Sequence, residues 1–170
     1  VDRAGLVNGT RVHYRLVART AAGNLPASNE ASAVPAAIEA VRNPGFESGT
    51  FAPGWFSGGA THEVRADAAR TGGFGYRQNG QYNNLVQTVG GLAAGRPHTL
   101  RVWVRSAIAT ARVAVNVNGG RIVANVPQTA SWTLLSIPFV PNGTAAEITL
   151  YEEAGRTGFT WADDWSVTED

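Results

Sequence analysis

Trp103 and the two arginines beside it are the residues of this sequence best suited to holding a sugar. Arg101, Trp103 and Arg105 alternate with aliphatic residues over positions 98–105, so the two sets face opposite sides of a strand. If the aliphatic side fills a core, the indole and both guanidinium groups face outward. Sugars present apolar C–H faces and hydroxyl groups, which bind aromatic rings and hydrogen-bonding side chains respectively. The pattern therefore predicts carbohydrate binding around Trp103, while a core position in a second sheet remains the alternative for this ring.

Other aromatic and amide side chains are candidates for the same sugar-binding face. Tyr151 alternates with Ile148 and Leu150, and two asparagines alternate with valines over positions 112–118. Two further tyrosines lie in a polar, glycine-rich stretch over 76–84, where turn formation is the alternative reading. We expect Asn116, Asn118 and Tyr151 to join Trp103 on one sheet face, and we expect Tyr76 and Tyr82 to contact the ligand from a loop or sheet edge.

Residues for catalysis are poorly placed. His13, His62 and His98 lie far apart, without metal-ligand spacing or a nucleophile motif. Glycoside hydrolysis needs two carboxyl groups set across a sugar, but Asp163 and Asp164 are adjacent, so their side chains should diverge on a strand. We therefore expect a protein that is not an enzyme.

Composition narrows the class of partner. The 170 residues carry a net charge of +1, with the basic residues spread along the chain, so nothing indicates nucleic acid or an acidic membrane surface as a partner. No apolar run approaches the roughly 20 residues needed to cross a bilayer. There is no cysteine, which excludes disulfides and thiolate metal sites. All 14 basic residues are arginine, a bias that we read as a GC-rich bacterial genome.

The elements that must position these residues are short strands. Alternating runs separated by glycine-rich turns follow one another from about residue 41 to the end, without sustained helical periodicity. This pattern predicts an all-β fold, a two-sheet β-sandwich. Residues 11–20 form one more alternating strand near the start. We therefore divide the chain into residues 1–37, a two-strand segment with a linker, and residues 38–170, the sandwich.

The first segment resembles the end of a fibronectin type III domain. The resemblance lies in GLVNGT (5–10), HYRLVA (13–18), AG (22–23) and SNE (28–30). It covers the last two strands of such a domain, and VPAAI (34–38) follows as a linker. The sequence departs from that family where its corner tyrosine is usually found, because Val12 stands there.

The second segment resembles the jelly-roll carbohydrate-binding modules of glycoside hydrolases, in the group that includes families 4, 9 and 22. The matching pieces occur in order: NPGFESG (43–49), GW (54–55), ARTGG (69–73), QTVGGL (87–92), WVR (103–105) and ADDWSV (162–167). The resemblance implies a β-jelly roll that binds a polysaccharide or oligosaccharide without catalysis. It also implies a catalytic domain in the same chain, which the module would hold at its substrate.

A structural calcium site is the second expectation. Calcium prefers six to eight hard oxygen ligands. Glu47 lies beside the first strand of the sandwich and Asp163 and Asp164 lie on the last, and such terminal strands can be neighbours. The turn at Thr71 and Gly73 could add main-chain carbonyl groups. The resemblance implies that calcium is held in this way, while the alternative is that the aspartates are solvated and Glu47 pairs with an arginine.

These readings together predict a secreted bacterial module that is monomeric. A second hypothesis stays open, in which the sandwich spaces domains or docks onto its own catalytic domain and binds no sugar.

Overall fold

The computed structural model describes residues 12–21, 23–33, 40–59, 61–80, 84–153 and 157–170. The chain divides into two units, Val1–Ile38 and Glu39–Asp170. Each unit is described by itself below.

The described residues of the first unit form a long β-hairpin. Strand β1 (Val12–Tyr14) pairs with β4 (Ala31–Ala33), and β2 (Arg19–Thr20) pairs with β3 (Gly23–Asn24), both antiparallel. The sequence predicted one strand over residues 11–20, but the strand is interrupted over 15–18. Backbone bonds still hold the two arms together there, from Leu25 N to Ala18 O at 2.9 Å and from Ser28 N to Leu16 O at 2.8 Å. That this hairpin belongs to a fibronectin type III domain stays a prediction.

The described residues of the second unit form ten strands and one short 3-10 helix. The 3-10 helix η1 covers Ala66–Ala68 and lies between the second and third strands of the unit. The strands are β5 (Phe56–Gly58), β6 (His62–Arg65), β7 (Gly75–Asn79), β8 (Asn84–Gly90), β9 (His98–Ser106), β10 (Ala111–Val117), β11 (Gly120–Asn125), β12 (Thr129–Phe139), β13 (Ala145–Glu152) and β14 (Phe159–Glu169).

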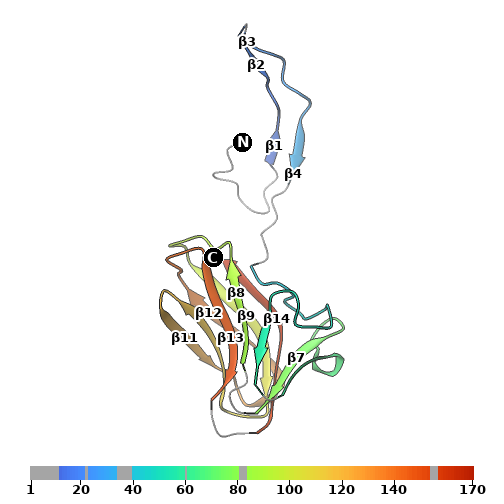
Figure 1. Ribbon diagram of the computed structural model, residues 1–170, viewed down its shortest axis with the longest axis vertical. Coiled ribbons are helices and arrows are strands. Elements are labelled where there is room, and N and C mark those ends of the chain that lie inside the picture. Colours follow the sequence, from blue (N-terminus) through green and yellow to red (C-terminus); the bar gives the residue numbers. More distant parts are fainter. Residues whose placement is uncertain (1–11, 22, 34–39, 60, 81–83, 154–156) are drawn as a thin grey trace. The chain divides into compact units, whose positions relative to one another are not determined.

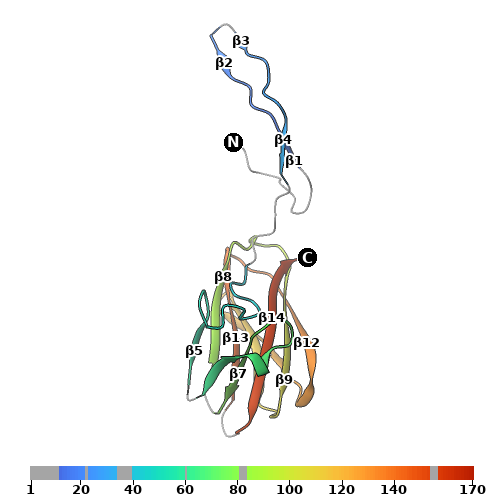
Figure 2. The same ribbon diagram turned by 90° about the vertical axis from the view of Figure 1, so that its right-hand side faces the viewer.

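These strands form two antiparallel five-stranded sheets. Sheet I has the order β11-β10-β13-β8-β5, and sheet II has the order β12-β9-β14-β7-β6. The two sheets lie face to face as layers (Figures 1 and 2). Strands that are neighbours in sequence repeatedly fall in opposite sheets, which gives a jelly roll. The predicted all-β, two-sheet sandwich is therefore confirmed.

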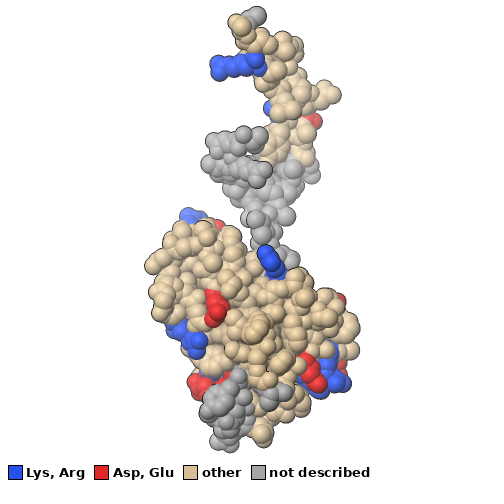
Figure 3. Space-filling model, viewed as in Figure 1, with Lys and Arg blue, Asp and Glu red and all other residues tan. Residues whose placement is uncertain are grey.

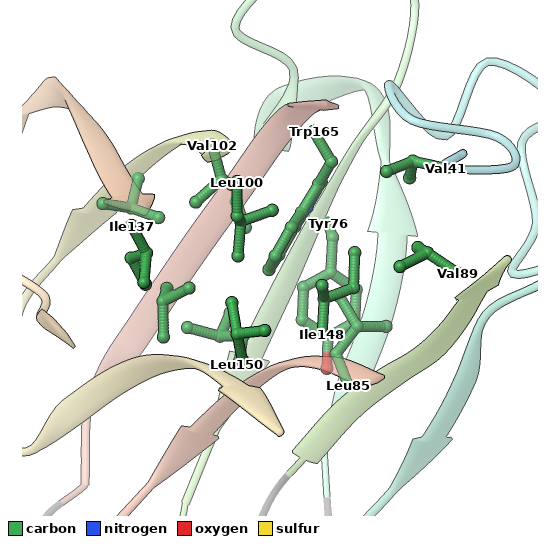
Figure 4. Packing of buried hydrophobic residues seen from close by; sticks show 14 of the residues in the cluster. Val41, Tyr76, Leu85, Val89, Leu100, Val102, Ile137, Ile148, Leu150 and Trp165 are labelled. Carbon is green, nitrogen blue, oxygen red and sulfur yellow. The ribbon is translucent and has the colours of Figure 1, made fainter. Parts of the chain in front are cut away.

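The core lies between the sheets and is built by the alternation seen in the sequence. Leu100 and Val102 of β9 point inward from sheet II, and Ile148 and Leu150 of β13 meet them from sheet I, all without exposed surface (Figure 4). Trp165 of β14 is also buried. Because every second residue of each central strand faces this core, the residues between them are left for the two outer faces.

Charged side chains are sparse on the face of the second unit seen in Figure 3, where isolated acidic and basic groups are scattered over a mostly uncharged surface. Within the described parts of the chain, no helix is long and apolar enough to pass through a bilayer.

Candidate functional site

The predicted sugar-binding residues lie on two opposite faces of the sandwich. Trp103 and its arginine neighbours, Arg101 and Arg105, face outward from β9 in sheet II. Asn116 of β10 and Tyr151 of β13 face outward from sheet I. The prediction of one shared face was therefore wrong. Alternation tells which residues of a strand share a side, but it does not tell to which sheet the strand belongs.

Two of the predicted tyrosines do not join either face. Tyr76 is fully buried, with its ring stacked at 5.6 Å from the ring of Phe46 and its hydroxyl donating to Gln78 Oε1 at 2.9 Å. Its prediction as a sugar contact was wrong because the polar, glycine-rich sequence that follows hides an inward-facing strand position. Tyr82 lies outside the described residues.

Asn118 lies in the turn after β10 and has a structural role. Its side chain donates from Nδ2 to Val140 O at 2.8 Å, and its Oδ1 accepts from Asn142 N at 2.7 Å. These bonds attach the β10–β11 turn to the segment that precedes β13. Asn118 therefore borders the outer face of sheet I, but both polar atoms of its side chain are hydrogen-bonded to backbone groups.

The outer face of sheet I is hollowed into an open groove. Two adjoining depressions, with volumes of ≈ 620 and ≈ 260 Å³, share Arg121 and Glu147 in their walls. The first also contains Asn116 and Asn118, and the second contains Tyr151. Because the two share walls, we treat them as one feature, the sheet I groove.

Strand register explains the shape of this groove. In one row across the sheet, Ala114 of β10 stands opposite Thr149 of β13, which stands opposite Val86 of β8. These short side chains form the floor, and Ala114 and Thr149 are buried although they face outward. Phe56 of β5 pairs with Val86 at the sheet edge and is 71% exposed, so it extends the apolar floor.

The rows on either side of the floor carry the polar groups. Asn116 stands opposite Arg121 on one side and Glu147 on the other, accepts from Arg121 Nε at 2.6 Å, and donates to Glu147 Oε1. The Arg121 guanidinium lies over the ring of Tyr151, 5.1 Å from its centroid. Tyr151 itself stands opposite Asn84 of β8. A guanidinium thus lies over one half-buried aromatic ring, and the carboxylate of Glu147 and the amide of Asn116 lie across the floor from that ring.

This arrangement can bind a polyhydroxylated ligand. The Tyr151 ring and the floor offer apolar contact to C–H faces, while Arg121, Glu147 and Asn116 offer donors and acceptors for hydroxyl groups. Sequence reasoning missed Arg121, Glu147 and Phe56. The alternation that selected Tyr151 also places Glu147 on the same face of β13, so that signal was available for the glutamate.

Trp103 has a different environment from the one predicted. Its ring faces outward from sheet II, but the guanidinium of Arg70 covers it, 3.7 Å from the ring centroid. Arg70 is held there by Asp164, which accepts from Nη1 at 2.7 Å. One face of the indole is therefore already in contact with a fixed cation.

The predicted metal-binding carboxylates do converge. A side-chain carbon placed on Gly45 would lie 3.5 Å from Glu47 Oε1, 3.5 Å from Asp163 Oδ1 and 3.6 Å from Asp164 Oδ1. The expectation that the two aspartates diverge was wrong, because β14 has an irregularity in its pairing with β9 between Asp163 and Ser166. Asp164 adopts a left-handed conformation there, with φ of 52°, and this turns both carboxylates to one side.

The turn over 70–73 supplies hydrogen-bond donors to these carboxylates. Asp163 accepts from the backbone N–H of Arg70 at 2.6 Å, Thr71 Oγ1 donates to Asp164 at 2.7 Å, and Gly73 N donates to Glu47 at 2.8 Å. Burial raises the pKa of Asp163 to about 6, with the neighbouring Asp164 charge adding to the rise. Among the described residues, no group of three or more histidine, cysteine or acidic side chains is arranged to hold a metal as it stands.

The donor chemistry of this cluster nevertheless suits a hard cation. Three carboxylates gathered around a glycine are the type of ligand that calcium prefers. Thr71 and Gly73, predicted as ligands through their carbonyl groups, contact the carboxylates here through donor groups.

Comparison with solved structures places this architecture among known ones. The family 61 carbohydrate-binding module TmCBM61, solved in complex with β-1,4-galactotriose, superposes with a TM-score of 0.62 at 20% identity, over 79% of this chain and 100% of that one. The chain has the jelly-roll fold of carbohydrate-binding modules.

Two further structures share the fold. The xylan-binding CBM22-1 domain of Xyn10C from Paenibacillus barcinonensis superposes with a TM-score of 0.56 at 17% identity, over 74% of this chain and 90% of that domain. The enzymatically active domain of tailspike protein 4 from bacteriophage CBA120 superposes with a TM-score of 0.68 at 15% identity, over 81% of this chain but 22% of the tailspike chain. No protein-family model matches the sequence, and no curated protein matches it either.

Proposed function

We propose that the second unit is a non-catalytic module that binds a neutral polysaccharide in the sheet I groove. The observation that carries this proposal is the groove itself, in which the Arg121 guanidinium lies over the Tyr151 ring and Asn116 and Glu147 line the opposite side of a floor of short side chains. The shared fold with modules solved with galactotriose or described as xylan-binding supports it. A secreted bacterial module of this kind would hold an attached catalytic domain at its substrate by raising the local concentration.

Calcium belongs to the same proposal. Glu47, Asp163 and Asp164 would hold the ion, and calcium would neutralise their converging charge. Its role would be structural, because the three residues belong to the start and the end of the sandwich. Arg70 would have to release Asp164 for the carboxylates to turn toward an ion.

The test is affinity electrophoresis of the purified chain through gels that contain xylan, β-glucan, mannan or galactan. We expect one or more of these polymers to retard the wild-type chain. Tyr151→Ala should weaken the association about thirtyfold, because losing the contact of one aromatic ring costs about 2 kcal/mol. Trp103→Ala is the matched control, since this ring lies on the opposite face and should leave retardation unchanged.

Two results would overturn the proposal. Free migration through every neutral polymer would remove carbohydrate binding as the function of the groove. Retardation that survives Tyr151→Ala but is lost in Trp103→Ala would assign binding to sheet II instead.

A further inference from the structure

The outer face of sheet II carries a row of alternating indole and guanidinium groups. Trp161 of β14 stands opposite Arg105 of β9 on one side and Arg77 of β7 on the other. Trp132 of β12 lies next to Arg105 on its other side, so that the Arg105 guanidinium is 4.6 Å from the Trp161 ring centroid and 5.0 Å from that of Trp132. Neighbouring strands lie roughly 4.8 Å apart, so the two indoles are about 10 Å apart with a cation between them.

Most of the arginines on this face have a carboxylate partner. Arg77 pairs with Glu63 at 2.6 Å, and Arg70 pairs with Asp164 at 2.7 Å. Arg65, at the end of β6, pairs with Asp67 at 2.9 Å.

Arg105 and Arg101 differ from these because neither forms an ion pair with any described residue. Arg105 reaches only the carbonyl oxygen of Asp67, at 3.5 Å, and its Nε is buried without a hydrogen-bond partner in the described structure. Among the described residues, Arg101 donates only to the hydroxyl of Thr168, at 2.8 Å. Both side chains project from the same side of β9 and are half-buried. Two cations on one strand are therefore left without a counter-charge, one of them between two rings that limit its hydration.

We infer that this surface binds a carboxylate-bearing polysaccharide, with Arg105 and Arg101 as the groups that recognise uronate carboxylates. A guanidinium complements a carboxylate through two parallel hydrogen bonds, and a partly desolvated guanidinium gains most from such a partner. Trp132 and Trp161 supply apolar surface on either side of Arg105, at a separation on the order of a disaccharide. The surface lies on the sheet opposite the groove, so this site is independent of the proposed function.

The charges around the row favour spaced carboxylates over a dense polyanion. Glu63 and Asp67 lie on the same face, at the β6 side of the row. They would repel the continuous phosphates of a nucleic acid or the sulfates of a highly sulfated chain. A uronate polymer whose charges are separated by sugar rings can place one carboxylate at each unpaired arginine and avoid these acids.

The experiment compares gels that contain de-esterified polygalacturonate, the same polymer fully methyl-esterified, or alginate, at low and at 0.3 M added salt. We expect a de-esterified polymer to retard the wild-type chain, with less effect after esterification and at high salt, because screening weakens exposed charge interactions. Arg105→Gln should reduce the association at least tenfold, and Arg105→Lys should recover only part of it, since lysine cannot form the forked pair. Arg96→Gln, which removes the same charge from an exposed ion pair with Glu169, is the control and should change little.

Arg105 also contacts two indoles, so its loss could disturb the fold. Arg101→Gln gives a second variant without ring contacts, and it should weaken retardation as well. Tyr151→Ala should keep this binding intact, which separates it from the groove. Equal retardation of Arg105→Gln, Arg101→Gln and wild type would overturn the inference, as would equal retardation by the methyl-esterified polymer or no retardation at all. Equally strong retention by heparin or single-stranded DNA would also overturn it, because the surface would then be a general polyanion site.

Discussion

Glu152 is a carboxylate enclosed between the two sheets at the end of β13. It is 3% exposed, and burial raises its pKa to about 7, while the neighbouring Thr160 and Gln78 side chains oppose the rise in part. Near neutral pH, a proton on this group therefore stabilises the folded chain. Glu152 lies on the inner side of β13, the strand that presents Tyr151 to the groove. A change in the charge of Glu152 therefore acts on the strand that carries Tyr151.

This pKa predicts that the chain is more stable at mildly acidic than at alkaline pH. The folded-state pKa lies above the ordinary value of 4.5 for a glutamate, so the stabilisation is complete below about pH 4.5 and is lost as the pH rises through 7. The full effect is up to about 3 kcal/mol. Urea unfolding of wild type at pH 5.5 and 8.5 should show the decrease, and Glu152→Gln should remove most of it. The exposed neighbour provides the control, since Glu153→Gln should keep the wild-type dependence; an unchanged dependence in Glu152→Gln would contradict the assignment.

Single residues were predicted well where one strand's alternation decides the outcome. Trp103 does face away from the aliphatic residues beside it. The prediction that Tyr76 contacts sugar was wrong because a tyrosine next to Gly, Asn and Gln is typical of a loop. Its hydroxyl is satisfied inside the core by Gln78, a polar partner that hydrophobicity alone does not reveal.

At the level of elements, β7 begins where the backbone is packed tightly against η1. A side-chain carbon on Gly75 would overlap the carbonyl group of Ala68, which is backbone and cannot rotate away. The glycine therefore sets how closely η1 approaches the sheet II strand.

This packing predicts opposite outcomes for two glycine substitutions. Gly75→Ala should lower the free energy of unfolding by about 1–3 kcal/mol, the usual cost of forcing extra volume into a packed site. Gly90→Ala at the end of β8 meets no atom within 4 Å, and it should be neutral or stabilising by up to about 1 kcal/mol. Urea unfolding of both variants measures the difference. Similar free energies for the two would show that η1 can move away from β7.

The irregularities within strands could not be predicted from alternation. A period of two predicts side-chain direction only while the strand is regular, and β14 breaks that period at Asp164. The break brings two adjacent carboxylates together, which regular geometry forbids. In the first unit, residues 15–18 keep an alternating sequence although the strand is interrupted there, so alternation alone did not reveal this break either.

At the scale of the whole molecule, the carboxylate cluster joins distant parts of the sequence. Glu47 precedes β5, the first strand of the sandwich, Asp163 and Asp164 lie on its last strand, and the turn over 70–73 adds hydrogen-bond donors. An ion bound there would favour the folded state, because unfolding separates the three carboxylates.

We therefore predict that calcium raises the melting temperature. At a concentration a hundredfold above the dissociation constant, binding adds about 2.7 kcal/mol, which corresponds to a shift of roughly 10 °C for a domain of this size. Differential scanning fluorimetry in EDTA, in calcium and in magnesium measures the shift, and Glu47→Gln should abolish it. The same melting temperature in EDTA and in calcium would leave the cluster as a set of hydrogen-bonded carboxylates without an ion.

The global architecture was more predictable than the site. Runs of alternating residues with turns between them indicated a two-sheet sandwich, because few other folds bury one side of so many short strands. The partition of strands between the sheets was not predictable, since pairing joins residues far apart in the sequence. Trp103 and Tyr151 were therefore placed together, although β9 and β13 belong to different sheets.

The outward positions of Trp103 and Tyr151 on opposite sheets have a mechanical consequence. Stacked sheets lie about 10 Å apart, so ligands on the two outer faces would be separated by roughly 20 Å of folded protein. A single copy that held one polymer on each face would act as a cross-link between them, without dimerising. In a mixed gel of neutral and acidic polymers, such a protein would raise the stiffness of the network in proportion to its own concentration.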